Sequence, residues 1–131
     1  MNNKLRVSLC LLRFSIFGVM LIWTVDKFVN PAHGVTVYQH FYFISGVDTT
    51  VMKILGGIEL AVLLAFLAGW QKIWTYGAVM TWHAVSTLSA FKQYLAPFDG
   101  PNLLFFAAWP MLAACVTLFL LRDEDRLLTA G

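Results

Sequence analysis

Three ionisable residues interrupt stretches of the sequence that are otherwise apolar: Arg13, Glu59 and His83. A charged side chain at the centre of a bilayer costs about 2.5–3.5 kcal/mol unless it finds a partner or water. Three arrangements would offset that cost. They are an ion pair between Arg13 and Glu59, a proton relay or acid–base pair formed by Glu59 and His83, and contact with a bound polar molecule.

Each of these residues also has a structural interpretation. Arg13 can anchor the chain in the inner leaflet, where its long side chain reaches water. His83 can ligate a haem or a metal, hold a quinone by a hydrogen bond, or bond to the neighbouring helix. A haem b needs two axial histidines at matched depth. His33 and His40 fall in a connecting segment, so we do not expect a haem.

The residues around His83 predict an intramembrane polar pocket, because Ser86 and Thr87 fall on broadly the same helical face. The predicted lining is Arg13, Glu59, His83, Ser86 and Thr87, and the predicted outer rim is Asp26, Lys27 and Tyr94. We assign no catalytic residue and no metal site, because the sequence has no nucleophile–base pair and no cluster of metal ligands. Cys10 and Cys115 form no CxxC unit, so we expect buried, uncharged thiols.

The composition indicates the solvent around these residues. Of the 131 residues, 60% are hydrophobic and 12% are charged, and the mean hydropathy is +0.73. Soluble domains carry about 25% charged residues, and a chain this short has too much surface to hide so much apolar area from water. The formal net charge of +2 is too small to indicate nucleic-acid binding. We therefore predict a single integral membrane domain over residues 1–131.

Four apolar stretches are long enough to cross the hydrocarbon as helices, which takes about 20 residues each. We expect an all-α bundle of four transmembrane helices at about residues 7–25, 51–70, 73–91 and 102–121. Asp26 and Lys27 should close the first helix, and the acidic and basic run at residues 122–126 should end the fourth in water. Residues 69–72 should form a tight turn, and Pro110 should kink the fourth helix.

The first apolar stretch and the connection after it raise two further points. No cleavage site of small residues follows the stretch, so we predict a retained helix and not a signal peptide. In residues 28–50 we expect a short helix in the outer interface, with a re-entrant segment as the alternative. Its aromatic-rich face at helical spacing would consist of Val37, Tyr38, Phe41, Tyr42 and Ile44.

The orientation follows from the basic residues near the predicted helix ends, since these accumulate on the cytoplasmic side. One side would carry Lys4, Arg6, Lys72, Arg122 and Arg126, and the other Lys27, Lys53 and Lys92. Both termini should therefore be cytoplasmic.

Short motifs in the predicted helices resemble those of the DoxX-like family of small four-helix bacterial membrane proteins. The first helix is similar to the family's layout of an arginine, a glycine, a lysine before an apolar residue, and a proline. The second is similar to its Gly-x-x-Glu helix that ends in a glycine turn. The residues concerned are Leu12-Arg13, Gly18, Asp26-Lys27-Phe28, Pro31, Leu55 to Leu60, Ala68-Gly69-Trp70, Asn102 and Ala107-Ala108.

The resemblance implies residence in the bacterial inner membrane and a part in membrane redox chemistry. Some family members are described as small subunits of a thiosulfate:quinone oxidoreductase, and others associate with thiol or oxidative-stress proteins. We therefore expect an accessory or anchoring subunit of a quinone-linked redox system. Its ligand would be a quinone or a lipid-like molecule, and its partners the lipid bilayer, a membrane or periplasmic redox protein, or further copies of the chain. A small oligomeric transporter that relays protons and a membrane enzyme on a hydrophobic substrate are the alternatives.

Overall fold

The computed structural model describes residues 3–41 and 48–130, and all regular structure in these two ranges is helical. The long elements are α1 (Asn3–Val29), α3 (Thr49–Leu67), α4 (Lys72–Ser89) and α6 (Ala108–Leu120), the last preceded without a break by the 3₁₀ helix η1 (Gly100–Ala107). The shorter ones are α2 (Pro31–Phe41), α5 (Phe91–Leu95) and the 3₁₀ turn η2 (Arg122–Glu124). The predicted all-α class is confirmed.

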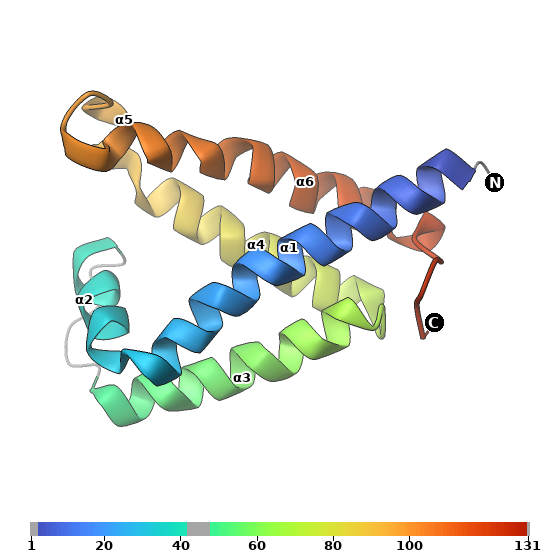
Figure 1. Ribbon diagram of the computed structural model, residues 1–131, viewed down its shortest axis with the longest axis horizontal. Helices are drawn as coiled ribbons and strands as arrows, with labels where there is room; N and C mark the ends of the chain where they lie inside the picture. Colours follow the sequence, from blue (N-terminus) through green and yellow to red (C-terminus); the bar gives the residue numbers. More distant parts are fainter. Residues whose placement is uncertain (1–2, 42–47, 131) are drawn as a thin grey trace.

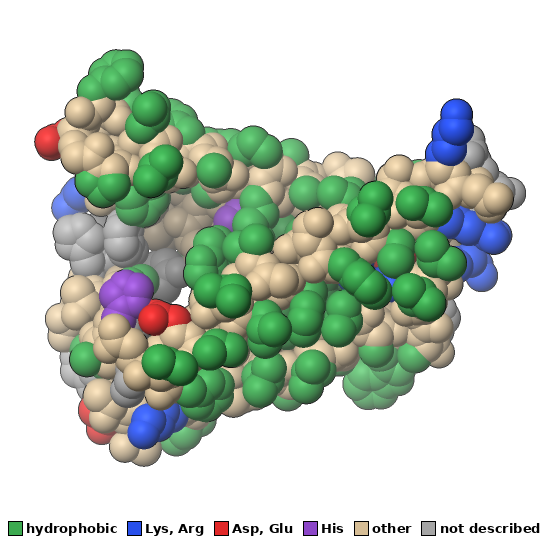
Figure 2. Space-filling model, in the orientation of Figure 1, with side chains coloured by type: hydrophobic (Ala, Val, Ile, Leu, Met, Phe, Trp, Pro, Cys, Tyr) green, Lys and Arg blue, Asp and Glu red, His purple; other side chains and the backbone are tan. Residues whose placement is uncertain are grey.

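Three of these segments can cross a membrane by length and composition, namely α1, α3 and the combined segment Gly100–Leu120. α4 is not among them, because Lys72, His83 and several threonines and serines lower its hydropathy. Figure 2 shows apolar side chains along the sides of the long helices and charged side chains toward the two ends of the molecule. This surface suits lipid and not water, which identifies a membrane protein.

α1 is longer than predicted at both ends. The prediction that Asp26 and Lys27 close it is wrong, because both lie in its last turn and the Asn30 amide still donates to the Asp26 carbonyl at 2.8 Å. Both charged side chains have partners on other helices, so the helix can continue through them. The break comes at Pro31, the first residue of α2, a position where a missing N–H costs nothing.

The predicted turn between the second and third apolar stretches is confirmed, and it ends α3 in a Schellman motif. The Trp70 amide donates to the Ala65 carbonyl and the Gly69 amide to that of Phe66, both at 3.0 Å. Gly69 adopts the left-handed conformation at φ +66°, which a residue with a side chain rarely does. The motif allows α4 to return beside α3.

Pro110 stands close to the start of α6. It lies in the first turn of α6, just after the chain changes from 3₁₀ to α geometry between Ala107 and Ala108. The irregular part of the fourth apolar stretch is therefore η1, and the kink expected at Pro110 stays a prediction.

The long segments form two antiparallel pairs, α1 with α3 and α4 with α6, and the pairs touch where α1 meets α6 and α3 meets α4. Figure 1 shows the pairs converging at the end that carries both chain termini, here named the closed end. They diverge at the end that carries α2 and α5, here named the open end. The core lies in the closed half: Leu9, Ile16, Met20, Leu63, Phe66, Tyr76, Val79, Cys115 and Leu118.

α2 packs against α1 and α3 at the open end. Figure 2 shows the molecule hollowed between α2 and the tip formed by α5 and η1. A helix is thus present in the connection where the sequence predicts one, while Tyr42 and Ile44 of its predicted aromatic face lie outside the described residues. Cys10 and Cys115 are buried and free of disulfides, as expected.

Candidate functional site

The closed end holds a fully buried ion pair between Arg13 of α1 and Asp125, which follows η2. The guanidinium Nη1 donates to Oδ1 of the carboxylate at 2.6 Å, and both side chains are 0% exposed. The other carboxylate oxygen, Oδ2, accepts a hydrogen bond from the Tyr76 hydroxyl at 2.6 Å. Both oxygens of this carboxylate therefore have donors from the protein itself.

Arg13 and Lys72 also hold the backbone around Asp125. Nη2 of Arg13 donates to the carbonyls of Leu127 and Leu128 at 2.7 and 3.1 Å, and Nζ of Lys72 donates to the Asp125 carbonyl at 2.6 Å. The prediction that the run after the fourth helix lies in water is therefore wrong for Asp125. A buried arginine needs a counter-charge, and the chain after α6 folds back to supply it.

At the open end, Glu59 of α3 pairs with Lys27 of α1. Nζ of Lys27 lies 2.9 Å from Oε2 of Glu59, and the Thr24 hydroxyl donates to the same oxygen at 3.3 Å. The two side chains are 13% and 9% exposed, so this pair reaches the surface. The Arg13–Glu59 ion pair considered from the sequence is not formed, because each residue has a different counter-charge.

The other two predicted rim residues have separate partners. Asp26 pairs with His33 of α2 on the surface, which ties α2 to the last turn of α1. Tyr94 of α5 packs its ring against those of Phe106 and Trp109. Burial raises the pKa of the Tyr94 hydroxyl above its ordinary value.

His83 of α4 combines deep burial with an unsatisfied ring nitrogen. It is 1% exposed, and its Nε2 lies 3.0 Å from the Ala108 carbonyl oxygen. Because a carbonyl oxygen only accepts, Nε2 of the neutral ring carries the proton and Nδ1 is an acceptor. Nδ1 is buried and has no hydrogen-bond partner among the residues that the structure describes. The Trp23 ring stacks on the imidazole, with centroids 6.0 Å apart and planes inclined by 20°.

The remaining predicted pocket residues lie beside His83. The Thr87 side chain is buried and its hydroxyl donates to the His83 carbonyl at 2.8 Å, while Ser86 is half-buried. The predicted pocket residues are thus found in three places: Arg13 at the closed end, Glu59 at the open end, and the other three along α4. Within the described part of the chain, no hydrogen bond joins Glu59 to His83.

Three residues that complete these sites were not found from the sequence: Trp23, Thr24 and Asp125. Thr24 had a local signal, since it lies three residues before Lys27 and so on the same helical face. Asp125 had none, because it stands in a run with two other acidic residues of the same local character. Trp23 is indistinguishable in sequence from aromatic residues that face lipid.

Within residues 3–41 and 48–130, no group of three or more His, Cys, Asp or Glu side chains is placed to hold a metal ion. No protein-family model, curated protein or solved structure matches the chain. The resemblance to the DoxX-like family therefore rests on the sequence motifs.

Proposed function

We propose that the chain crosses the bacterial inner membrane four times, through α1, α3, α4 and the η1–α6 segment. The placement of polar residues on α4 supports the fourth crossing. Thr75, His83 and Thr87 are buried against other helices. Except for Thr81, the exposed positions of α4 are apolar: Ile73, Trp74, Ala78, Val85 and Leu88. The 18 residues of α4 rise about 27 Å, close to the roughly 30 Å of hydrocarbon.

The proposed orientation places the closed end, and with it both termini, in the cytoplasm, and α2 in the outer interface. The two termini lie at the same end of the molecule (Figure 1). Basic residues near the closed end outnumber those near the open end, which is the cytoplasmic bias. They are Lys4, Arg6, Lys72, Arg122 and Arg126, against Lys27, Lys53 and Lys92.

In this membrane the chain acts as a non-catalytic, anchoring subunit of a quinone-linked redox system, the role that the family resemblance implies. The observation that carries this proposal is the unsatisfied Nδ1 of His83 beside the half-exposed Trp23. A buried acceptor without a donor costs free energy, and a ligand hydroxyl would remove that cost. A quinol, the reduced form of a membrane quinone, carries such a hydroxyl on a flat ring that can stack on an indole.

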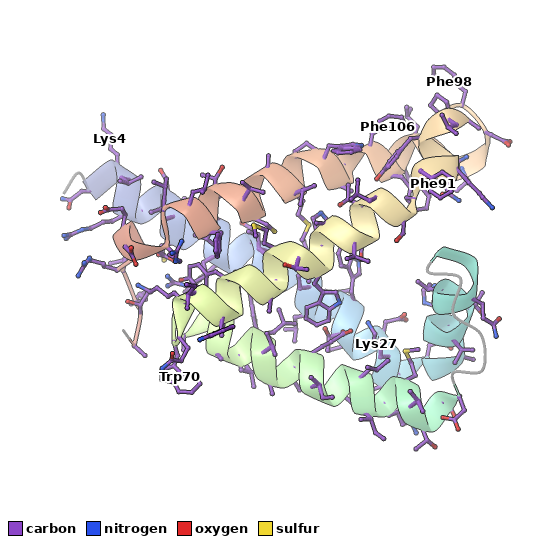
Figure 3. All side chains as sticks on the ribbon, turned by 180° about the vertical axis from the view of Figure 1, so that it is seen from behind. Lys4, Lys27, Trp70, Phe91, Phe98 and Phe106 are labelled. Atoms are coloured by element: carbon purple, nitrogen blue, oxygen red, sulfur yellow. The ribbon has the colours of Figure 1, made fainter. Side chains whose placement is uncertain are left out.

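The position of His83 suits a ligand dissolved in the bilayer. It follows Lys72 by eleven residues, about 16 Å along the helix and near the membrane midplane. Trp23 is 47% exposed, which leaves ring surface available to a ligand. Toward the open end the helix pairs diverge, and Figure 3 shows Phe91 and Lys27 on opposite sides of that divergence.

Titration of the purified chain in lipid nanodiscs with a short-chain quinol, followed by tryptophan fluorescence, tests the ligand. We expect His83→Ala to weaken binding about tenfold, because one buried hydrogen bond is lost. His33→Ala is the matched control, since it makes the same change at an exposed histidine, and it should leave the affinity unchanged. Equal affinities in the two variants would contradict the assignment of His83.

The anchoring role has its own experiment. Extraction of the native complex in a gentle detergent should recover a redox protein in stoichiometric amount with the chain. Recovery of the chain alone, as an oligomer with full function, would contradict the subunit role whatever the quinol titration shows.

A further inference from the structure

The chain after α6, residues 121–130, folds back across the closed end, and it is named the plug segment here. Beyond the short turn η2 it has no helix. Asp125 inserts between the helices, whereas the other side chains of the plug segment are exposed or half-buried. The Asp125 carboxylate is thus the one fully buried side-chain attachment of the plug segment, and the Ala130 amide adds a backbone attachment by donating to the Ala68 carbonyl at 2.6 Å.

Most of the hydrogen bonds that hold the plug segment come from side chains on two helices, α1 and α4. Arg13 on α1 contributes the bonds to the Asp125 carboxylate and to the Leu127 and Leu128 carbonyls. Tyr76 and Lys72 on α4 contribute one each. Leu128 is held at φ +55°, a conformation that residues other than glycine rarely adopt. The segment therefore keeps a strained backbone only while these bonds persist.

The side chains that receive the Asp125 carboxylate form a socket built into the core. Tyr76 is 1% exposed and belongs to the core cluster, and Leu9 and Ile16 of that cluster flank Arg13 on the same face of α1. Departure of the plug segment would leave a buried guanidinium and a phenol hydroxyl aimed at one point, with Lys72 beside them. A guanidinium and a hydroxyl that can donate to the two oxygens of one carboxylate form a carboxylate-binding site.

We propose that Arg13 and Tyr76 form a carboxylate-binding socket that the chain fills with its own Asp125, and that the plug segment is releasable. A free carboxylate of small size, such as formate, takes the place of Asp125 when the segment leaves. The proposal depends on the fold at the closed end and not on the proposed redox role at the other end.

Rescue of Asp125→Ala by formate tests the socket. The purified variant should unfold at a lower temperature than the wild type, because Arg13 loses its counter-charge. Formate should raise that temperature saturably by about 5 °C, since a ligand that binds only the folded state stabilises it. Chloride at equal ionic strength should not. Asp123→Ala, which removes the exposed acid two positions away, should show neither the loss nor the rescue.

Trypsin cleavage after Arg126 reports separately on the plug segment. In Asp125→Ala, cleavage should be fast and should stay fast in formate, because formate fills the socket without re-docking the segment. In the wild type, cleavage should accelerate with formate and not with chloride, which tests the proposal even where Asp125→Ala does not accumulate. Equal effects of formate and chloride on both readouts, or full rescue in Asp125→Ala combined with Arg13→Gln, would overturn it.

Discussion

The two ends of the bundle accommodate a basic residue of α1 in different ways. Each pairs a basic residue of α1 with an acidic residue from elsewhere in the chain, Arg13 with Asp125 and Lys27 with Glu59. At the closed end both partners are 0% exposed and the guanidinium makes further bonds to carbonyl groups. At the open end the partners are 13% and 9% exposed, and the lysine can extend toward the surface.

The positions of the two basic residues around the axis of α1 do not explain this difference in exposure. Arg13 and Lys27 are 14 residues apart, close to four helical turns, so they lie on the same side of α1 about 21 Å from one another. What differs is how completely the rest of the protein covers each of these two side chains. At the closed end the helix pairs converge and the plug segment closes over the arginine, whereas at the open end the pairs diverge (Figure 1). The ion pair at the first end is therefore buried more completely than the pair at the second end, which has more room to adjust around a ligand.

The largest expected effect is at the closed end. Arg13→Gln should lower the free energy of unfolding by about 3–5 kcal/mol, because it leaves the Asp125 carboxylate buried without its counter-charge. Combining it with Asp125→Asn should recover part of the loss, which a double-mutant cycle in detergent measures. The control Arg126→Gln, at an exposed arginine, should stay within about 0.5 kcal/mol of the wild type. A loss no greater than in this control would remove the distinction between the ends.

The second effect tests how tightly the plug segment fits against the α3–α4 turn. A Cβ added at Gly69 would lie 2.7 Å from the Thr129 side chain, and the residue has φ +66°. Gly69→Ala should therefore cost about 2 kcal/mol, of which the left-handed backbone accounts for about half or more. Thr129→Gly in the same protein should relieve the contact but not the backbone cost. Unfolding free energies that return fully to the wild-type value in the double variant would contradict this division.

At the open end the corresponding change should matter less. Glu59→Gln removes the partner of Lys27, but the lysine reaches the surface and can be solvated there, so we expect a loss of about 1 kcal/mol. The same measurement on Glu124→Gln, which has no ion pair within the described residues, gives the baseline. A loss as large as that of Arg13→Gln would show that the open end is as rigid as the closed one.

The features of this molecule that the sequence predicted are those with local causes. Apolar stretches of membrane length predict long helices, and Gly69 marks the turn where α3 ends, because a left-handed residue is needed there. The boundary of α1 was predicted too early for a reason that is not local. Asp26 and Lys27 stay helical because the His33 and Glu59 side chains pair with them, and only the folded arrangement supplies those partners.

The candidate sites were predicted only in part, because their partners also come from the folded arrangement and not from the local sequence. That Arg13, Glu59 and His83 need partners follows from the cost of burying them, but the identity of each partner does not. Asp125 is 112 residues from Arg13, and the acceptor for His83 is a backbone carbonyl, which every residue possesses. The sequence thus indicates which buried polar groups need a hydrogen-bond or ion-pair partner. The packing of the fold decides which residue supplies that partner.

The smallest expected effect uses two adjacent glycines of α3 to measure how readily the open end adjusts. A Cβ at Gly56 would lie 3.1 Å from the Phe28 ring, while one at Gly57 would meet nothing within 4 Å. Alanine favours a helix over glycine by about 0.5–1 kcal/mol, so Gly57→Ala should stabilise the protein by that amount. Gly56→Ala should fall within about 0.5 kcal/mol of the wild type, because the gain in helix propensity is offset by close contacts with the Phe28 ring and with the Lys27 Cβ at 3.2 Å. A loss at Gly56 equal to that at Gly69 would mean that the open end is as closely packed as the closed end.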